Sequence, residues 1–87
     1  MNSYSGNSHY ILWVKSHCPW CKKAEKKLSE KGLSYNVFVM DDNLEELGRV
    51  KERHQWDTVP LVLEVTSRGK ISLIGGCTDL EAVLGEK

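Results

Sequence analysis

Alternation between apolar and polar residues divides the first half of the chain into three predicted elements. A near-continuous apolar run at 9–15, HYILWVK, is typical of a strand buried on both faces, and we expect it at the centre of a sheet. Residues 18–31 combine good helix formers with apolar positions three and four apart, and Gly32 provides a stop, which predicts an amphipathic helix. Residues 33–40 alternate again and predict a second strand, parallel to the first because a helix joins the two.

The second half predicts another helix, a β-hairpin and a final helix. Acidic residues open the stretch at 41–56, and its apolar positions recur at helical spacing, beginning with Leu44 and Leu47. Two β-rich runs, PLVLEV and KISLIGG, flank the connection TSRGK and predict the hairpin. In the last stretch, CTDLEAVLGEK, Thr78 followed three residues later by Glu81 has the spacing of a capping box, with Thr78 as the N-cap.

The order of elements is therefore strand, helix, strand, helix, strand, strand, helix. Eighty-seven residues suit one domain, which we assign to residues 9–87, with residues 1–8 as a flexible polar leader. Neither an internal repeat nor a linker interrupts the pattern.

Charge and composition narrow the function classes. Twelve basic residues balance twelve acidic ones, which argues against nucleic acid or an anionic membrane as the main partner. The opening MNSYSGNSHY has no basic flank or apolar core of a signal peptide, and no run approaches the roughly 18 apolar residues of a membrane span. We therefore expect a soluble, cytoplasmic protein. Three cysteines, an odd number, do not fit a secreted disulfide framework and favour redox or metal chemistry.

Two of these cysteines form the motif Cys18-Pro19-Trp20-Cys21, directly after the first predicted strand. Cys18 falls at the first turn of the predicted helix, whose unpaired N–H groups and dipole stabilise a thiolate, the nucleophile of disulfide exchange. Pro19 suits the first helical position because its missing N–H is not needed there. Cys21 lies one turn further on the same side, so it is placed to resolve a mixed disulfide formed on Cys18.

Two other interpretations of the pair fit the sequence less well. A zinc site normally needs four ligands, and only Cys77 and the three histidines at positions 9, 17 and 54 remain, none of them in a paired spacing. A purely structural disulfide across three residues would be unusual in a reducing compartment. A CxxC that follows a strand and opens a helix instead favours redox catalysis, with no metal ligand expected.

Three motifs in register resemble the glutaredoxin family over residues 9 to 85. They are Lys15 three residues before a Cys-Pro-aromatic-Cys, the TVP of Thr58 to Pro60, and the GGCTDL of Gly75 to Leu80. The resemblance implies an α/β, thioredoxin-like fold, βαβαββα, with a four-stranded mixed sheet flanked by three helices. It also implies a cis peptide before Pro60 and the use of glutathione as a co-substrate, with no cofactor bound permanently.

The resemblance further implies a glutathione site, whose parts suit a tripeptide with two carboxylates and an amino group. Lys15 would attract the glycyl carboxylate and favour the thiolate. The backbone of Val59 would pair with the cysteinyl part, and the turn at Gly76 would leave room for the γ-glutamyl part. The complete expected set is Lys15, Trp20, Thr58, Val59, Pro60, Gly76, Cys77, Thr78 and Asp79, with Asp79 taking the α-amino group. Within this set Cys77 is expected to be a small buried residue.

Some positions depart from the family's pattern or stay open. Trp20 stands where tyrosine is usual, so the phenol hydroxyl is absent. The hairpin is longer than the family usually needs, which makes its tip either a partner surface or a tolerated insertion. A further contact with glutathione is expected from the second helix, and the spacing does not choose among Arg49, Lys51, Arg53 and Gln55.

The resemblance thus implies a monomeric, glutathione-dependent thiol-disulfide oxidoreductase that reduces protein disulfides and glutathione mixed disulfides through Cys18 and Cys21. A ribonucleotide reductase is one candidate substrate by resemblance alone. Two alternatives stay open: a hydrogen donor fed by thioredoxin reductase, against which the GGCTDL motif argues, and a module in which two chains share an iron-sulfur cluster through Cys18 and glutathione.

Overall fold

A computed structural model describes residues 8–85, so residues 1–7 of the leader predicted at 1–8 and the last two residues of the predicted final helix lie outside it. The order of elements along the described chain is the one expected from the sequence pattern. The strands are β1 (His9–Val14), β2 (Ser34–Val39), β3 (Leu61–Val65) and β4 (Ile71–Gly75), and the helices are α1 (Pro19–Glu30), α2 (Leu44–His54) and α3 (Cys77–Val83).

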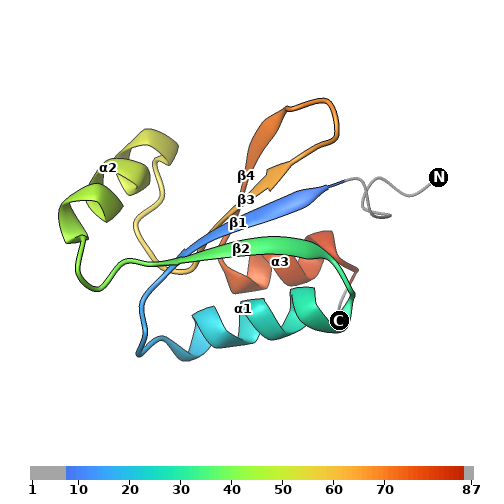
Figure 1. Ribbon diagram of the computed structural model, residues 1–87, viewed down its shortest axis with the longest axis horizontal. Helices are drawn as coiled ribbons and strands as arrows, with labels where there is room; N and C mark the ends of the chain where they lie inside the picture. The colour runs from blue at the N-terminus through green and yellow to red at the C-terminus, as the bar shows by residue number, and fades with distance from the viewer. Residues whose placement is uncertain (1–7, 86–87) are drawn as a thin grey trace.

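The four strands form one mixed sheet in the order β2-β1-β3-β4 (Figure 1). β1 pairs parallel with β2, because α1 carries the chain back between them, and antiparallel with β3. β4 pairs antiparallel with β3 as the second half of the hairpin. The prediction that β1 is a central strand and that the fold is α/β with a mixed sheet is confirmed.

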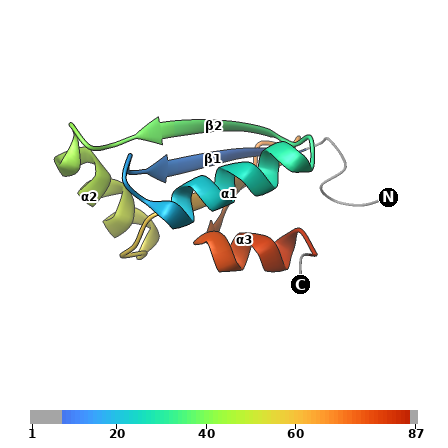
Figure 2. The same cartoon turned by 90° about the horizontal axis from the view of Figure 1, so that it is seen from below.

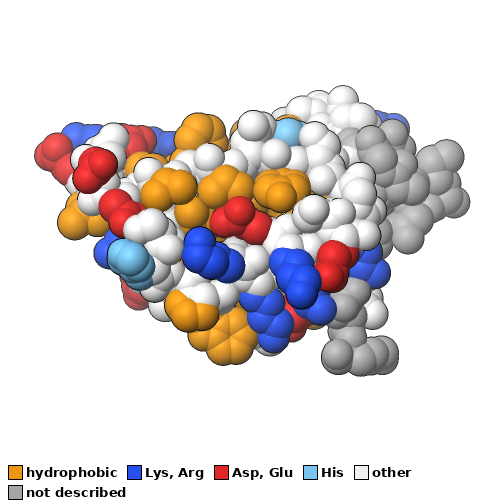
Figure 3. Space-filling model, turned by 60° about the horizontal axis from the view of Figure 1, so that its bottom comes forward, with side chains coloured by type: hydrophobic (Ala, Val, Ile, Leu, Met, Phe, Trp, Pro, Cys, Tyr) orange, Lys and Arg blue, Asp and Glu red, His pale blue; other side chains and the backbone are white. Residues whose placement is uncertain are grey.

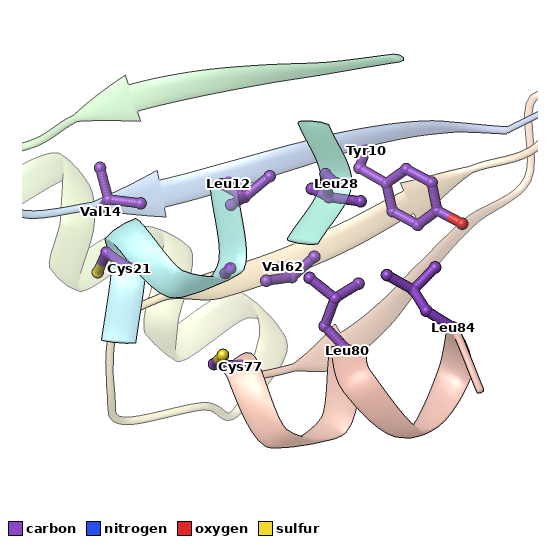
Figure 4. Packing of buried hydrophobic residues seen from close by; sticks show 10 residues of the cluster. Tyr10, Leu12, Val14, Cys21, Leu28, Val62, Cys77, Leu80 and Leu84 are labelled. Carbon is purple, nitrogen blue, oxygen red and sulfur yellow. The ribbon is translucent and has the colours of Figure 1, made fainter. Parts of the chain in front are cut away.

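One face of the sheet is covered by α1 and α3, which lie side by side beneath the strands in Figure 2. The sequence pattern explains this packing because alternate residues of β1, namely Tyr10, Leu12 and Val14, are buried on that face. Figure 4 shows them meeting Cys21 and Leu28 of α1 from one side and residues of α3 from the other. The main core thus lies between the sheet and the two helices, and one of the paired cysteines belongs to it.

The opposite face of the sheet is covered only in part. α2 lies at the end toward which β1 and β2 point (Figure 2), where Val50 packs with Leu61 and Leu63 of β3. Trp13 lies against this second cluster and stacks on Phe38, with ring centroids 5.6 Å apart. Leu44, which the helical spacing places on the apolar side, is 56 % exposed, so that part of the expectation is wrong. It is the first residue of α2 and only the following turns reach the sheet.

The N-terminus of α3 differs from the expected capping box. Gly76, not Thr78, is the N-cap, so the helix begins at Cys77. The carboxylate that accepts the N-cap N–H belongs to Asp79, whose Oδ2 lies 3.0 Å from the Gly76 nitrogen. The sequence TDLE has residue types typical of a helix cap. The chain nevertheless turns at Gly75, with φ +121°, so the N-cap lies two residues before the position that this pattern predicts.

On the face drawn in Figure 3, basic and acidic side chains are interspersed between apolar patches, so no large area of a single charge is evident there. Within residues 8–85, no helix combines the length and the apolar character needed to cross a membrane.

Candidate active site

Cys18 caps the N-terminus of α1, at the point where the chain leaves β1 and enters the helix. Its backbone is extended, with φ −118° and ψ 104°, and Pro19 follows at the start of the helix as expected. The sulfur of Cys18 accepts the backbone N–H of Cys21 at 3.1 Å, in the manner of an N-cap side chain. A donor aimed at the sulfur favours its anionic form, so the local geometry suits a nucleophilic thiolate.

Cys21 sits one helical turn further and forms a disulfide with Cys18, with the two Cα atoms 5.2 Å apart. The two cysteines differ in access: Cys21 is fully buried in the core, whereas Cys18 is only half-buried. An external disulfide can therefore approach only Cys18 directly. The expected division of roles, with Cys18 attacking and Cys21 resolving from inside, agrees with this asymmetry.

A pocket of about 340 Å³ lies where the two ends of the hairpin meet. Thr58 to Pro60 precede β3 and Gly76 to Asp79 follow β4, and the pairing of Val62 with Gly75 holds these segments together. The Val59–Pro60 peptide bond is cis, as the resemblance implies. The pocket is lined by Trp20, Trp56, Thr58, Val59, Pro60, Gly76, Cys77, Thr78 and Asp79.

This pocket adjoins the cysteine pair. The sulfur of Cys18 lies 3.8 Å from the carbonyl oxygen of Val59, a residue of the lining. The structure therefore gathers the residues expected for glutathione, with the exception of Lys15, around one cavity beside the nucleophile. Lys15 is exposed in the loop that leads to Cys18 and lies close enough to Asp41 to help lower the pKa of that carboxyl.

Trp20 forms an exposed wall of the pocket and is held by neighbouring charges. The ammonium of Lys23 lies 5.1 Å from the centroid of the indole, and Glu81 of α3 lies 3.5 Å from the same ammonium. Lys27 also approaches Glu81, at 4.0 Å. Because a cation over an indole face is attractive, these contacts restrict an aromatic side chain that is 54 % exposed.

Trp56 is a pocket residue that sequence reasoning missed. It follows Gln55, which ends α2 in the left-handed conformation at φ 54°, and its N–H bonds to the carbonyl of Lys51 at 2.9 Å. An apolar residue just beyond a left-handed helix end usually folds back onto the structure, but a glutamine at that end gives no sequence signal of the left-handed conformation. Within the described residues, the buried indole N–H of Trp56 has no hydrogen-bond partner.

The four open candidates of α2 do not line the pocket. Arg49 is engaged on its own helix, 2.8 Å from a Glu46 oxygen and 3.5 Å from a Glu45 oxygen. Trp56, which follows these candidates in the chain, lines the pocket instead.

Cys77, which lines the pocket, is buried as expected and is only 4 % exposed. Burial, and next the nearby Glu81 carboxylate, raise the pKa of the Cys77 thiol above its ordinary value. A thiol of raised pKa is protonated at neutral pH and is a poor nucleophile. No group of three or more His, Cys, Asp or Glu side chains suited to hold a metal ion occurs between residues 8 and 85.

Comparison with known proteins identifies the class. The family model for glutaredoxin matches residues 11–64. Glutaredoxin 3 of Escherichia coli K12 is 32 % identical over 72 residues, which cover 83 % of this chain and 81 % of that protein.

Solved structures agree with the fold. A wheat glutaredoxin superposes with a TM-score of 0.73 at 28 % identity, over 95 % of this chain and 73 % of that one. A thioredoxin of Plasmodium falciparum superposes with a TM-score of 0.57 at 13 % identity, over 97 % of this chain and 74 % of that one, and this likeness concerns the fold alone.

Fold and site together define a thiol-disulfide oxidoreductase on the thioredoxin-like fold. The chain belongs to the glutaredoxin family.

Proposed function

We propose that this protein is a dithiol glutaredoxin, which reduces protein disulfides and glutathione mixed disulfides at the expense of glutathione. The observation that supports this most is the position of the pocket: its lining residue Val59 lies 3.8 Å from the sulfur of Cys18. A small thiol bound there would meet the reacting sulfur.

The first step is attack by the Cys18 thiolate on one sulfur of the substrate disulfide. The S–S bond of the substrate breaks, a new S–S bond joins Cys18 to one half of the substrate, and the other half leaves as a thiolate that takes a proton from water. The N–H of Cys21 and the start of α1 stabilise the attacking thiolate.

The mixed disulfide is resolved in one of two ways. On a protein substrate, the Cys21 thiolate attacks Cys18, closes the intramolecular disulfide and expels the second substrate thiol; two glutathione molecules then reduce that disulfide and leave as oxidised glutathione. On a glutathione mixed disulfide, a second glutathione attacks the glutathione bound to Cys18, and Cys21 is not needed. The first route consumes two glutathione thiols per substrate disulfide. The second consumes one, because the other half of the oxidised glutathione comes from the mixed disulfide itself.

Recognition of glutathione would be shared along the pocket. The backbone of Val59 pairs with the cysteinyl part, and Lys15 attracts the glycyl carboxylate from the loop before Cys18. The γ-glutamyl part lies against the segment from Gly76 to Asp79. The carboxylate of Asp79 is exposed and binds the Gly76 N–H through Oδ2, which leaves lone pairs for the α-amino group.

A coupled assay with two electron sources tests the proposal. The reduced protein is given a disulfide substrate with glutathione and glutathione reductase, or with thioredoxin reductase in their place. Activity is expected only with glutathione. Cys18→Ser should abolish it on every substrate, whereas Cys21→Ser should keep part of it on glutathione mixed disulfides. Turnover with thioredoxin reductase alone, or equal loss in both variants, would contradict the assigned roles.

The cluster-binding alternative has a different signature. Protein purified without oxygen should show no visible chromophore, because Pro19 stiffens the turn and Cys21 competes for Cys18 as a disulfide partner. A brown colour that depends on Cys18 would favour an iron-sulfur module instead.

Three further properties belong to the same proposal. The protein acts in the cytoplasm as a monomer, takes glutathione as a co-substrate without a permanently bound cofactor, and counts disulfide proteins such as a ribonucleotide reductase among its substrates. Size-exclusion chromatography with light scattering checks the monomer, and trapping with Cys21→Ser captures protein substrates as mixed disulfides with Cys18.

A further inference from the structure

The loop that leads to Cys18 is tied to a carboxylate that does not belong to the pocket. Oδ1 of Asp41 accepts the backbone N–H of Ser16 at 2.9 Å, and Oδ2 of the same residue accepts the Ser16 hydroxyl. Ser16 stands between Lys15 and His17, two residues before the reactive cysteine. One side chain thus holds the approach to the nucleophile through two hydrogen bonds.

The fold explains why these residues meet although they are 25 positions apart in the chain. β1 and β2 are parallel and end together, with Val14 paired to Val39, and the N–H of Met40 still bonds to the carbonyl of Val14 at 2.9 Å. Figure 2 shows both strands pointing toward the same end. Beyond this last backbone hydrogen bond between the two strands, the Asp41 carboxylate links the two segments by accepting hydrogen bonds from Ser16 in the loop.

The groups around Asp41 also favour the charged form of its carboxyl. The two hydrogen bonds from Ser16, and then the nearby His17 and Lys15, lower the pKa of the Asp41 carboxyl below its ordinary value. The carboxylate is therefore ionised throughout the neutral range. Asp42, the next residue, is an exposed residue of the same type, and within residues 8–85 its side chain does not bond to Ser16.

We propose that Asp41 is a positioning residue of the redox site: by holding Ser16 it fixes the loop from Lys15 to His17, and thereby the place of the Lys15 charge relative to the Cys18 sulfur. The inference rests on disulfide exchange at Cys18 and does not depend on glutathione. Replacement of Asp41 has two separable effects, the loss of a negative charge and the release of the loop. Asparagine removes only the charge, because its amide can still bond to Ser16, and alanine removes both.

The test measures the pH dependence of Cys18 alkylation in the reduced full-length protein. Iodoacetamide labelling is followed by mass spectrometry from pH 4 to 9, with fragmentation of the peptide to separate Cys18 from Cys21. Asp41→Asn is expected to match the unaltered protein or to titrate at slightly lower pH. Asp41→Ala is expected to titrate about half a pH unit or more above Asp41→Asn, which is roughly a threefold lower thiolate fraction near neutral pH.

Asp42→Asn and Asp42→Ala form the matched control pair and should give the same profile as each other. Turnover with a disulfide substrate should fall about threefold in Asp41→Ala, in line with the lower thiolate fraction, and recover in Asp41→Asn, with far-UV circular dichroism unchanged in both. Coincident alkylation profiles and turnover for Asp41→Ala and Asp41→Asn would overturn the proposal, because the carboxylate would then act by charge alone. A difference as large between the two Asp42 variants would overturn it as well. If glutathione dependence fails while these shifts appear, the positioning role stands and the proposed electron donor does not.

Discussion

Gly75 offers the sharpest test of how the pocket is built. It ends β4 with φ +121°, a conformation that residues with a side chain rarely adopt. A Cβ placed on it would lie 2.6 Å from Oδ2 and 2.9 Å from Cγ of Asp79. The substitution Gly75→Ala therefore strains the backbone and displaces the carboxylate that accepts the Gly76 N–H.

The two costs can be estimated separately. A residue held in a sparsely populated backbone region costs about 1–3 kcal/mol. Loss of the hydrogen bond from Gly76 to Asp79 at the start of α3 costs about 0.5–2 kcal/mol, as for other helix caps. A total near ~3 kcal/mol corresponds, for a domain of this size, to a melting temperature about 12–24 °C lower.

Thermal unfolding of the reduced protein, followed by circular dichroism, measures the effect, and two other glycines supply matched controls. Gly48 lies inside α2 with nothing within 4 Å of its added Cβ, so Gly48→Ala should stabilise the protein by about 0.4–1 kcal/mol. Gly76 is extended, with φ −100° and ψ −163°, and its added Cβ would meet Trp56 at an ordinary 3.5 Å. Gly76→Ala should therefore cost less than about 1 kcal/mol.

A melting temperature of Gly75→Ala within about 3 °C of the unaltered protein would refute this prediction, and so would a destabilisation of Gly76→Ala as strong as that of Gly75→Ala. The first result would mean that the turn at the end of β4 relaxes at little cost. The second would mean that crowding against Trp56, and not backbone conformation, limits this segment.

Three further predictions concern side chains of the site and its approach. Asp79→Asn should raise the KM for glutathione about tenfold, as expected for a lost charge-assisted hydrogen bond, while Asp42→Asn leaves it within twofold; equal KM values would remove Asp79 from the binding site. In the reduced protein at pH 8, iodoacetamide should label Cys77 at least tenfold more slowly than Cys18, because Cys77 is buried and its pKa is raised; comparable rates by mass spectrometry would count against this. Because the pKa of Asp41 is lowered on folding, its contribution to stability is present above the ordinary carboxyl value of 3.8 and is lost as the pH falls through the folded value. The difference in melting temperature between the unaltered protein and Asp41→Ala should thus stay constant from pH 7 to 5 and shrink as the pH falls below 3.8, and a difference that does not shrink with acidification would contradict it.

Much of the fold could be predicted because the spacing of apolar residues within one strand or helix depends only on neighbouring sequence. The same spacing decides which side chains face the core in the assembled sheet. The run from His9 to Val14 had the apolar density of a central strand, and the chain must return through α1 before β2 can pair with it. The same holds for Cys18 and Pro19 at the start of α1, because capping and proline preferences act over one turn.

The rest depended on contacts that no local pattern encodes. Thr78 is a residue type that often caps a helix. The start of α3 is nevertheless set by the end of β4 and the positive φ of Gly75. Trp56 entered the pocket because Gln55 ends α2 in the left-handed conformation, which glycine would have signalled and glutamine does not. The contact between Ser16 and Asp41 follows from the parallel ends of two strands and becomes visible only once the sheet is assembled.

The pocket is formed at the two ends of one hairpin, and the middle of that hairpin contributes no residue to its lining. The connection between β3 and β4 closes on itself through Thr66, which bonds to Gly69 and Lys70, at the far end of the strands from Pro60 and Gly75. Length and composition at this tip can change without moving either wall of the cavity. It is therefore a suitable position for a fluorophore, an affinity tag or an inserted domain.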